Sequence, residues 1–150
     1  MRFEIIEGYP SESLVQQICS LSIPTYPSEL FNNQLSQQKN ILSCLAFDRE
    51  ELIAFKIGYQ PRPKLFESFL GFVSPNYRRK GVGTHLIEIQ HNWCSKNEYH
   101  YINTIAASEN NAMLILNLKS GFNITGTFLD RGKNQKIILQ KQLPSLGLGT

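Results

Sequence analysis

Seven segments of the chain carry apolar residues that alternate with polar ones or form short continuous runs, and both patterns are typical of β-strands. These segments are residues 2–7, 41–47, 52–59, 66–73, 101–107, 122–129 and 136–142. Pro61 and Pro63 are expected to end the third strand. The charged residues 48–51 lack the glycine of tight hairpins and therefore predict a slightly longer loop. Residues 101–107 are nearly all apolar and predict a buried central strand, and the last two strands predict a hairpin across 130–133.

Helical spacing of apolar residues predicts four helices between these strands. The first begins after Ser11, a candidate N-cap, and is broken by Pro24 and Pro27. The second begins at Ser28 and extends towards Gln38.

The third helix covers residues 81–95, with one apolar stripe along it. The stripe consists of Val82, Leu86, Ile89 and Trp93. His91 points away from the stripe and is expected to be solvated, and Cys94 is expected to pack inside. The fourth helix covers residues 110–120, with Gly121 as its left-handed C-terminal cap.

This order of elements predicts a mixed α/β fold in which antiparallel hairpins flank a strand-helix-strand centre. A chain of 150 residues is long enough for one domain with one sizeable core, so we expect a single domain over residues 1–150. Residues 144–150 predict a loose tail.

Composition narrows the function classes. The net charge of +3 is mild; it suits a small anionic ligand better than nucleic acid. Apolar runs are too short to cross a bilayer, and the acidic residues within 2–7 argue against a signal peptide. Three cysteines without a C-x-x-C pair predict a reduced, cytoplasmic protein. The three histidines lack metal-ligand spacing, so no metal is expected.

The strand that ends at Val73 leads into a basic, glycine-containing loop at the start of the third helix. The loop residues are Arg78, Arg79, Lys80, Gly81, Val82 and Gly83. A helix N-terminus offers unpaired N–H groups and partial positive charge, and glycines let the backbone approach a phosphate closely. The segment therefore predicts a site for a dianion such as a pyrophosphate.

The loop resembles the signature of the GNAT superfamily of N-acetyltransferases, Arg/Gln-x-x-Gly-x-Gly/Ala after a strand. Arg78, Gly81 and Gly83 occupy its fixed positions. A second element of that family, a helix that begins near an Asn and ends in Gly-Phe, is matched by Asn110 and by Gly121-Phe122. The resemblance implies the GNAT fold, a twisted, mostly antiparallel sheet of about seven strands flanked by about four helices. It also implies acetyl-coenzyme A as cosubstrate and a primary amine as acceptor.

The resemblance further implies which residues bind the cosubstrate. Backbone groups of the loop and the first helical turn would hold the pyrophosphate: Arg79, Lys80, Gly81, Val82, Gly83 and Thr84. The pantetheine arm would lie along Phe72 and Val73, and Asn110 would contact the cofactor. Simple helix capping is the alternative role of Asn110, and both roles can hold together.

Glu67 is the candidate general base, because an amine must lose a proton when it attacks a thioester. Strict alternation would place Glu67 on one face with Phe69, Gly71 and Val73, and apolar neighbours would raise its pKa. Relatives whose base lies on this strand carry it at the matching position. A solvent-facing carboxylate at the end of the strand is the alternative.

Asn117 departs from the pattern of the family, in which many members have a tyrosine acid at this position. An amide can hydrogen-bond sulfur or pantetheine but cannot serve as an acid near neutral pH. The alternative to catalysis is therefore a sensor or regulatory module of the same fold that binds acetyl-coenzyme A. The acceptor is a small-molecule or peptide amine of unspecified identity, and edge strands make a homodimer possible.

Overall fold

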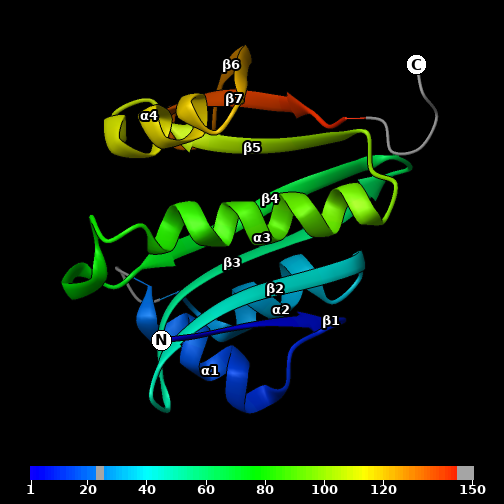
Figure 1. The fold of residues 1–150 in the computed structure, drawn as a ribbon. Helices are drawn as coiled ribbons and strands as arrows, with labels where there is room; N and C mark the ends of the chain where they lie inside the picture. The colour runs from blue at the N-terminus through cyan, green and yellow to red at the C-terminus, as the bar shows by residue number, and fades with distance from the viewer. Residues whose placement is uncertain (23–25, 145–150) are drawn as a thin grey trace.

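A computed structural model describes residues 1–22 and 26–144, and it contains one seven-stranded sheet in the order β1-β2-β3-β4-β5-β7-β6 (Figure 1). The strands are β1 (Arg2–Glu7), β2 (Lys39–Asp48), β3 (Glu51–Arg62), β4 (Leu65–Val73), β5 (Tyr101–Ala107), β6 (Asn123–Leu129) and β7 (Gln135–Gln142). The helices are α1 (Glu12–Leu21), α2 (Ser28–Leu35), α3 (Val82–Lys96) and α4 (Asn111–Lys119), with a 3₁₀ turn at Pro75–Tyr77. In this part of the chain no helix is long and apolar enough to span a membrane.

The predicted order of elements and the mixed α/β class are confirmed, whereas several boundaries differ. Helix α2 ends at Leu35, because the Asn- and Gln-rich segment after it adds no apolar face. Strand β3 continues through Pro61 to Arg62, past its predicted end. Asp48 pairs with Glu51 across a two-residue turn, tighter than predicted, in which Arg49 has a φ of 58°. Pro24 and the predicted tail after Pro144 lie outside the described residues.

The sheet separates two apolar layers. One face packs against α1 and α2 through residues such as Ile18, Phe31 and Phe55. The other face packs against α3 and α4, the α3/α4 layer, through residues such as Phe66, Leu86 and Met113. Figure 1 shows α3 crossing β3 and β4, and α4 lying beside β5 and β7. The N-terminal four strands therefore have helices on both faces.

Strands β4 and β5 pair in parallel only where they begin. The pairing extends from Leu65–Tyr101 to Ser68–Thr104, although β4 continues to Val73 and β5 to Ala107. Their ribbons separate towards the N-terminus of α3 (Figure 1). The sheet therefore opens at its middle, beside the loop singled out in the sequence. Strand β5 is central but not fully buried, since Tyr101 and Ile105 are 39% and 49% exposed.

A β-bulge interrupts β4 next to this opening. Ile57 of β3 pairs with Leu70 and the next residue, Gly58, pairs with Ser68, so β4 has one extra residue, Phe69. A bulge shifts the alternation of side chains by one. Phe69 accordingly packs with the α1/α2 layer, whereas Val73 packs with the α3/α4 layer. The prediction that Glu67 shares a face with Gly71 and Val73 is therefore wrong, because a bulge lies between them.

Candidate active site

The loop between β4 and α3 has the backbone shape that its residues predict. Arg79 and Gly81 have positive φ angles of 62° and 80°. Gly81 occupies the N-cap position of α3, and a side chain built there would meet no atom within 4 Å. Glycine accommodates this left-handed conformation without strain. The chain thus enters α3 through an open, exposed turn.

The N-terminus of α3 has no side-chain cap. The side chain of Ser11 caps α1, and that of Asn110 caps α4. The first intrahelical bond of α3 that reaches the loop runs from His85 N to Gly81 O, at 3.0 Å. In the described chain, the N–H groups of Val82, Gly83 and Thr84 therefore remain available to a ligand.

The basic side chains of the loop surround this helix end. Arg78 folds back over the end of β4, where its Nε donates to Val73 O at 2.9 Å and its guanidinium lies 5.3 Å from the Phe72 ring. The Lys80 amine lies 5.6 Å from the ring of Tyr77, whose hydroxyl donates to Asp48. The loop is thereby attached to β4 and to the β2–β3 turn, and its cations remain exposed.

Glu67 is half-buried on the α1/α2 face, at the point where β4 and β5 separate. It stands opposite Tyr59 in β3 and beside Asn103 in β5. Burial raises the pKa of Glu67 from 4.5 to about 7, although the nearby Arg62 charge opposes the shift. The carboxyl group can therefore accept a proton near neutral pH, as a general base must.

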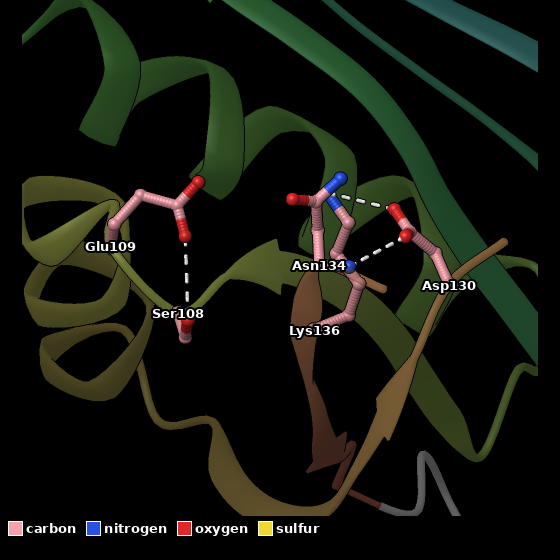
Figure 2. A network of polar contacts seen from close by, with 5 residues as sticks. All are labelled: Ser108, Glu109, Asp130, Asn134 and Lys136. Atoms are coloured by element: carbon pink, nitrogen blue, oxygen red, sulfur yellow. Dashed lines mark hydrogen bonds and ion pairs between the residues drawn. The ribbon is translucent and has the colours of Figure 1, made fainter. Parts of the chain in front are cut away.

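Polar contacts fix the start of α4. The Asn110 side chain accepts a hydrogen bond from Met113 N at 3.2 Å, so its capping role is confirmed. Figure 2 shows the adjoining contacts, in which Asp130 accepts from Asn134 N at 2.9 Å and lies 3.9 Å from the Lys136 amine. Ser108 N donates to Gln135 O. The β6–β7 turn thereby holds the β5–α4 connection in place.

Asn117 is 2% exposed, and its side-chain oxygen has no hydrogen-bond partner in the described chain. Gln90 of α3 and Ser68 of β4 also contain buried polar atoms without partners. These residues belong to the elements that border the sheet opening on the α3/α4 side. Unpaired buried groups are costly, and a polar ligand that enters the opening would pair with them. The residues present therefore fit acetyl-coenzyme A.

His91 is 6% exposed, and the prediction that it is solvated is wrong. The ring lies 5.4 Å from that of Phe122, and its Nδ1 lies 3.0 Å from the Lys141 amine. Burial and the charges of Lys141 and Lys56 lower the pKa of His91 to about 3. The contacts come from the C-terminal hairpin, which the pattern of α3 alone does not reveal.

One surface cavity lies far from the loop, and another begins at Thr84, just after it. One of about 610 Å³ is at the other end of the sheet, between the end of β1 and the C-terminus of α3, and Tyr9, Trp93 and Tyr99 line it. A second of about 310 Å³ lies between α3 and the end of α4, beside Thr84 and Lys141. The described residues contain no cluster of three side chains that could hold a metal ion. Cys94 is buried, as predicted, and all three cysteines are free.

Comparison with known proteins supports this interpretation. The sequence model of the acetyltransferase (GNAT) family matches residues 12–122. The ribosomal-protein-S18-alanine N-acetyltransferase of Escherichia coli has 15% sequence identity, with 99% of each chain covered and a TM-score of 0.80. Arabidopsis thaliana NAA60, solved with a bisubstrate analogue, has 17% identity over 95% of this chain and 99% of its own, with a TM-score of 0.74.

An aminoglycoside 6'-N-acetyltransferase complexed with coenzyme A has 15% identity over 94% of this chain and 98% of its own. Its TM-score is 0.75. At such identities the likeness establishes a common fold. No curated protein sequence matches the chain.

Proposed function

The chain belongs to the GNAT acetyltransferase family, and we propose that it transfers the acetyl group of acetyl-coenzyme A to a primary amine. The observation that carries this proposal is the uncapped N-terminus of α3 beside the open part of the sheet. Three free N–H groups, the helix dipole and the cations Arg78, Arg79 and Lys80 favour a pyrophosphate there.

The two substrates would bind on opposite faces of the sheet. Acetyl-coenzyme A would reach the opening from the α3/α4 side, along Phe72 and Val73, and supply an acetyl thioester. The amine would approach from the α1/α2 side, where Glu67 can take its proton. Direct attack in a ternary complex would follow where the two substrates meet, beside the unpaired parts of β4 and β5.

The acceptor site would adjoin Glu67 on the open face of β5 and β7. Tyr101 and Ile105 are exposed there, and the Gln140 amide donates to Asn103 Oδ1 at 2.8 Å. This surface offers apolar and amide groups, with few acids. It therefore suits an amine with one positive charge, such as a small amine or a peptide N-terminus, better than a polycation.

Binding is tested by calorimetric titration of acetyl-coenzyme A into the wild type, Thr84→Glu and Thr84→Gln. Thr84 is exposed in the first turn of α3, so glutamate there keeps or increases helix stability while repelling a pyrophosphate. We expect micromolar binding by the wild type and by Thr84→Gln, and much weaker binding by folded Thr84→Glu. Wild-type protein that binds no acetyl-coenzyme A would refute the proposal.

Catalysis is tested by thiol release from acetyl-coenzyme A across a panel of amines, with Glu67→Gln as the matched variant. We expect turnover by the wild type, and a reduction of kcat/KM by roughly 10² to 10⁴ in Glu67→Gln, as for loss of a general base. Binding without turnover, with every amine tested, would instead identify a sensor.

A further inference from the structure

We propose that Lys56 is the general acid of this protein, in place of the tyrosine that Asn117 replaces. The inference rests on the proposed function and deepens it, because it assigns the proton that the departing thiolate receives. It follows from the position of one lysine on the cosubstrate side of the sheet.

Lys56 lies in the middle of β3, between the apolar residues Phe55 and Ile57. Its partner in β4 is Gly71, in the segment that has left β5. Phe55 and Ile57 face the α1/α2 layer, so Lys56 faces the α3/α4 layer. A Cβ atom built on Gly71 would lie 3.7 Å from Lys56 Cγ and 3.8 Å from Nζ. The lysine therefore extends across Gly71 of the neighbouring strand, towards the opening.

No carboxylate compensates this charge. The described residues form two ion pairs, Arg2–Glu4 and Lys136–Asp130, and Lys56 belongs to neither. Burial lowers the pKa of Lys56 to about 8. A group with such a pKa is mostly protonated at neutral pH and gives up its proton readily, as a general acid must.

The groups around Lys56 do not take its place. Cys44 of β2 is opposite Lys56, and burial raises the pKa of its thiol to about 12. Burial also raises the pKa of Cys94 on α3. His91 of α3 is neutral and lies against Lys141 of β7, whose own pKa burial lowers.

Tyr77 and Tyr99 do not take its place either. The hydroxyl groups of Tyr77 and Tyr99 donate to Asp48 and Gln60, and Gln60 lies at the other end of β3. In the described part of the chain, Lys56 is thus the lysine that lies against Gly71, in the unpaired part of β4.

The proton balance is complete. The acceptor nitrogen bonds to the acetyl carbon and loses a proton to Glu67. The carbon–sulfur bond breaks, its electron pair goes to sulfur, and the Lys56 ammonium donates a proton to that sulfur. Glu67 then releases its proton to solvent, and Lys56 regains one from solvent. The acid and the base act from opposite faces of the sheet.

The test compares Lys56→Met and Lys56→Arg with a matched control, Lys141→Met, on the same face. Methionine is a near-isostere, and replacing a buried charge by an apolar group is often neutral or stabilising, so the variant should fold. We expect kcat to fall by about 10² in Lys56→Met and Lys56→Arg, since arginine keeps the charge but does not donate its proton. The wild-type rate should decline as pH rises through about 8, and this decline should be absent in Lys56→Met. Lys141→Met should retain the wild-type rate.

A second readout needs no turnover. Ultraviolet absorbance of the thiolate gives the thiol pKa of bound coenzyme A, which we expect to be lower in the wild type and in Lys56→Arg than in Lys56→Met. Equal thiol pKa values in all three would overturn the inference, as would full activity of Lys56→Arg. Acetylation of Lys56 after incubation with acetyl-coenzyme A alone would also overturn it, because the amine would then be a nucleophile. Failure of the wild type to bind acetyl-coenzyme A would instead refute the proposed function.

Discussion

Glu67 should make the stability of this protein depend on pH, because its carboxyl group is half-buried without a paired cation. Its pKa is about 7 in the folded protein and 4.5 in the unfolded chain. The folded state therefore binds more protons between these values, and the free energy of unfolding falls as pH rises from 4.5 to 7. We predict that Glu67→Gln increases stability at pH 8 by about 1–2 kcal/mol, after allowing for solvent screening.

Urea unfolding of the wild type and Glu67→Gln at pH 5 and pH 8 measures this effect. The gain should be confined to the higher pH, where the wild-type carboxylate is charged. A gain of equal size at both values would contradict the prediction, since packing alone would then explain it. Glu88, an exposed acid on α3, provides the control, and Glu88→Gln should change stability little at either pH.

Single residues could be predicted from the sequence only where a local motif specifies them. The glycines and cations of the loop at 78–83 form such a motif, and so does the capping Asn110. Lys56 carried a weaker signal, a lone charge within the apolar run of β3, and its significance depends on Gly71 in the next strand. His91 was mispredicted because the hairpin that covers it comes from residues 50 positions further along the chain.

The bulge in β4 is an element whose geometry depends on Gly58. A methyl group at Gly58 would overlap the Phe66 ring and the Glu67 carbonyl oxygen, closer than atoms can pack. We predict that Gly58→Ala lowers stability by about 2–3 kcal/mol, because β4 must move or the ring must leave its site. Thermal or urea unfolding measures the loss.

Gly71→Ala is the control for this prediction. Its methyl group would lie 3.5 Å from the Phe55 carbonyl oxygen, an ordinary contact, and strands prefer alanine to glycine. Little change or a small gain in stability is therefore expected. A similar loss of stability in both variants would show that any side chain at these strand glycines is destabilising. The bulge would then have no particular need for glycine at position 58.

Replacing Gly83, in the first turn of α3, by alanine should make the protein more stable but weaken its binding of acetyl-coenzyme A. A methyl group there would lie 3.6 Å from Leu116 and 3.7 Å from Val73, so it fits without displacement. Alanine is the better helix former by about 0.5–1 kcal/mol, and Gly83→Ala should gain about that much. The methyl group narrows the space between α3, α4 and the end of β4, so acetyl-coenzyme A should bind several-fold more weakly. Urea unfolding and calorimetric titration on one preparation measure both effects. Unchanged affinity would contradict the placement of acetyl-coenzyme A between α3, α4 and the end of β4.

The type and order of the elements followed from their patterns, whereas their irregularities did not. Period-two and helical spacings are local properties, and they located all seven strands and four helices. The bulge at Phe69 and the extension of β3 through Pro61 arise from pairing between strands, which one segment does not encode. The opening of the sheet after Ser68 is likewise a property of two strands.

At the scale of the whole molecule, the divergence of β4 and β5 lets the two halves of the proposed site come from different faces of the sheet. The sheet is continuous from Leu65 to Ser68 and then divides, so a group on the α3/α4 side can approach one on the α1/α2 side. The fold could be predicted from the family resemblance, whereas the roles that we propose for Lys56 and Glu67 could not. Those roles depend on how β3, β4 and β5 are aligned with one another, which no single segment of the sequence encodes.

A ligand that fills the opening should replace the missing strand contacts, and amide hydrogen exchange should detect this. We predict that acetyl-coenzyme A slows exchange at residues 69–73 and 82–84, where β4 lacks a neighbour on one side and α3 lacks a cap. Exchange in β1 and β2 should not change, because these strands lie on the far side of β3. Thr84→Glu under the same conditions should show no protection in either segment. Protection limited to 82–84 would mean that the phosphate binds at the helix while the pantetheine arm does not lie along β4. The thioester would then not lie beside Lys56 and Glu67, and the roles proposed for these two residues would be contradicted.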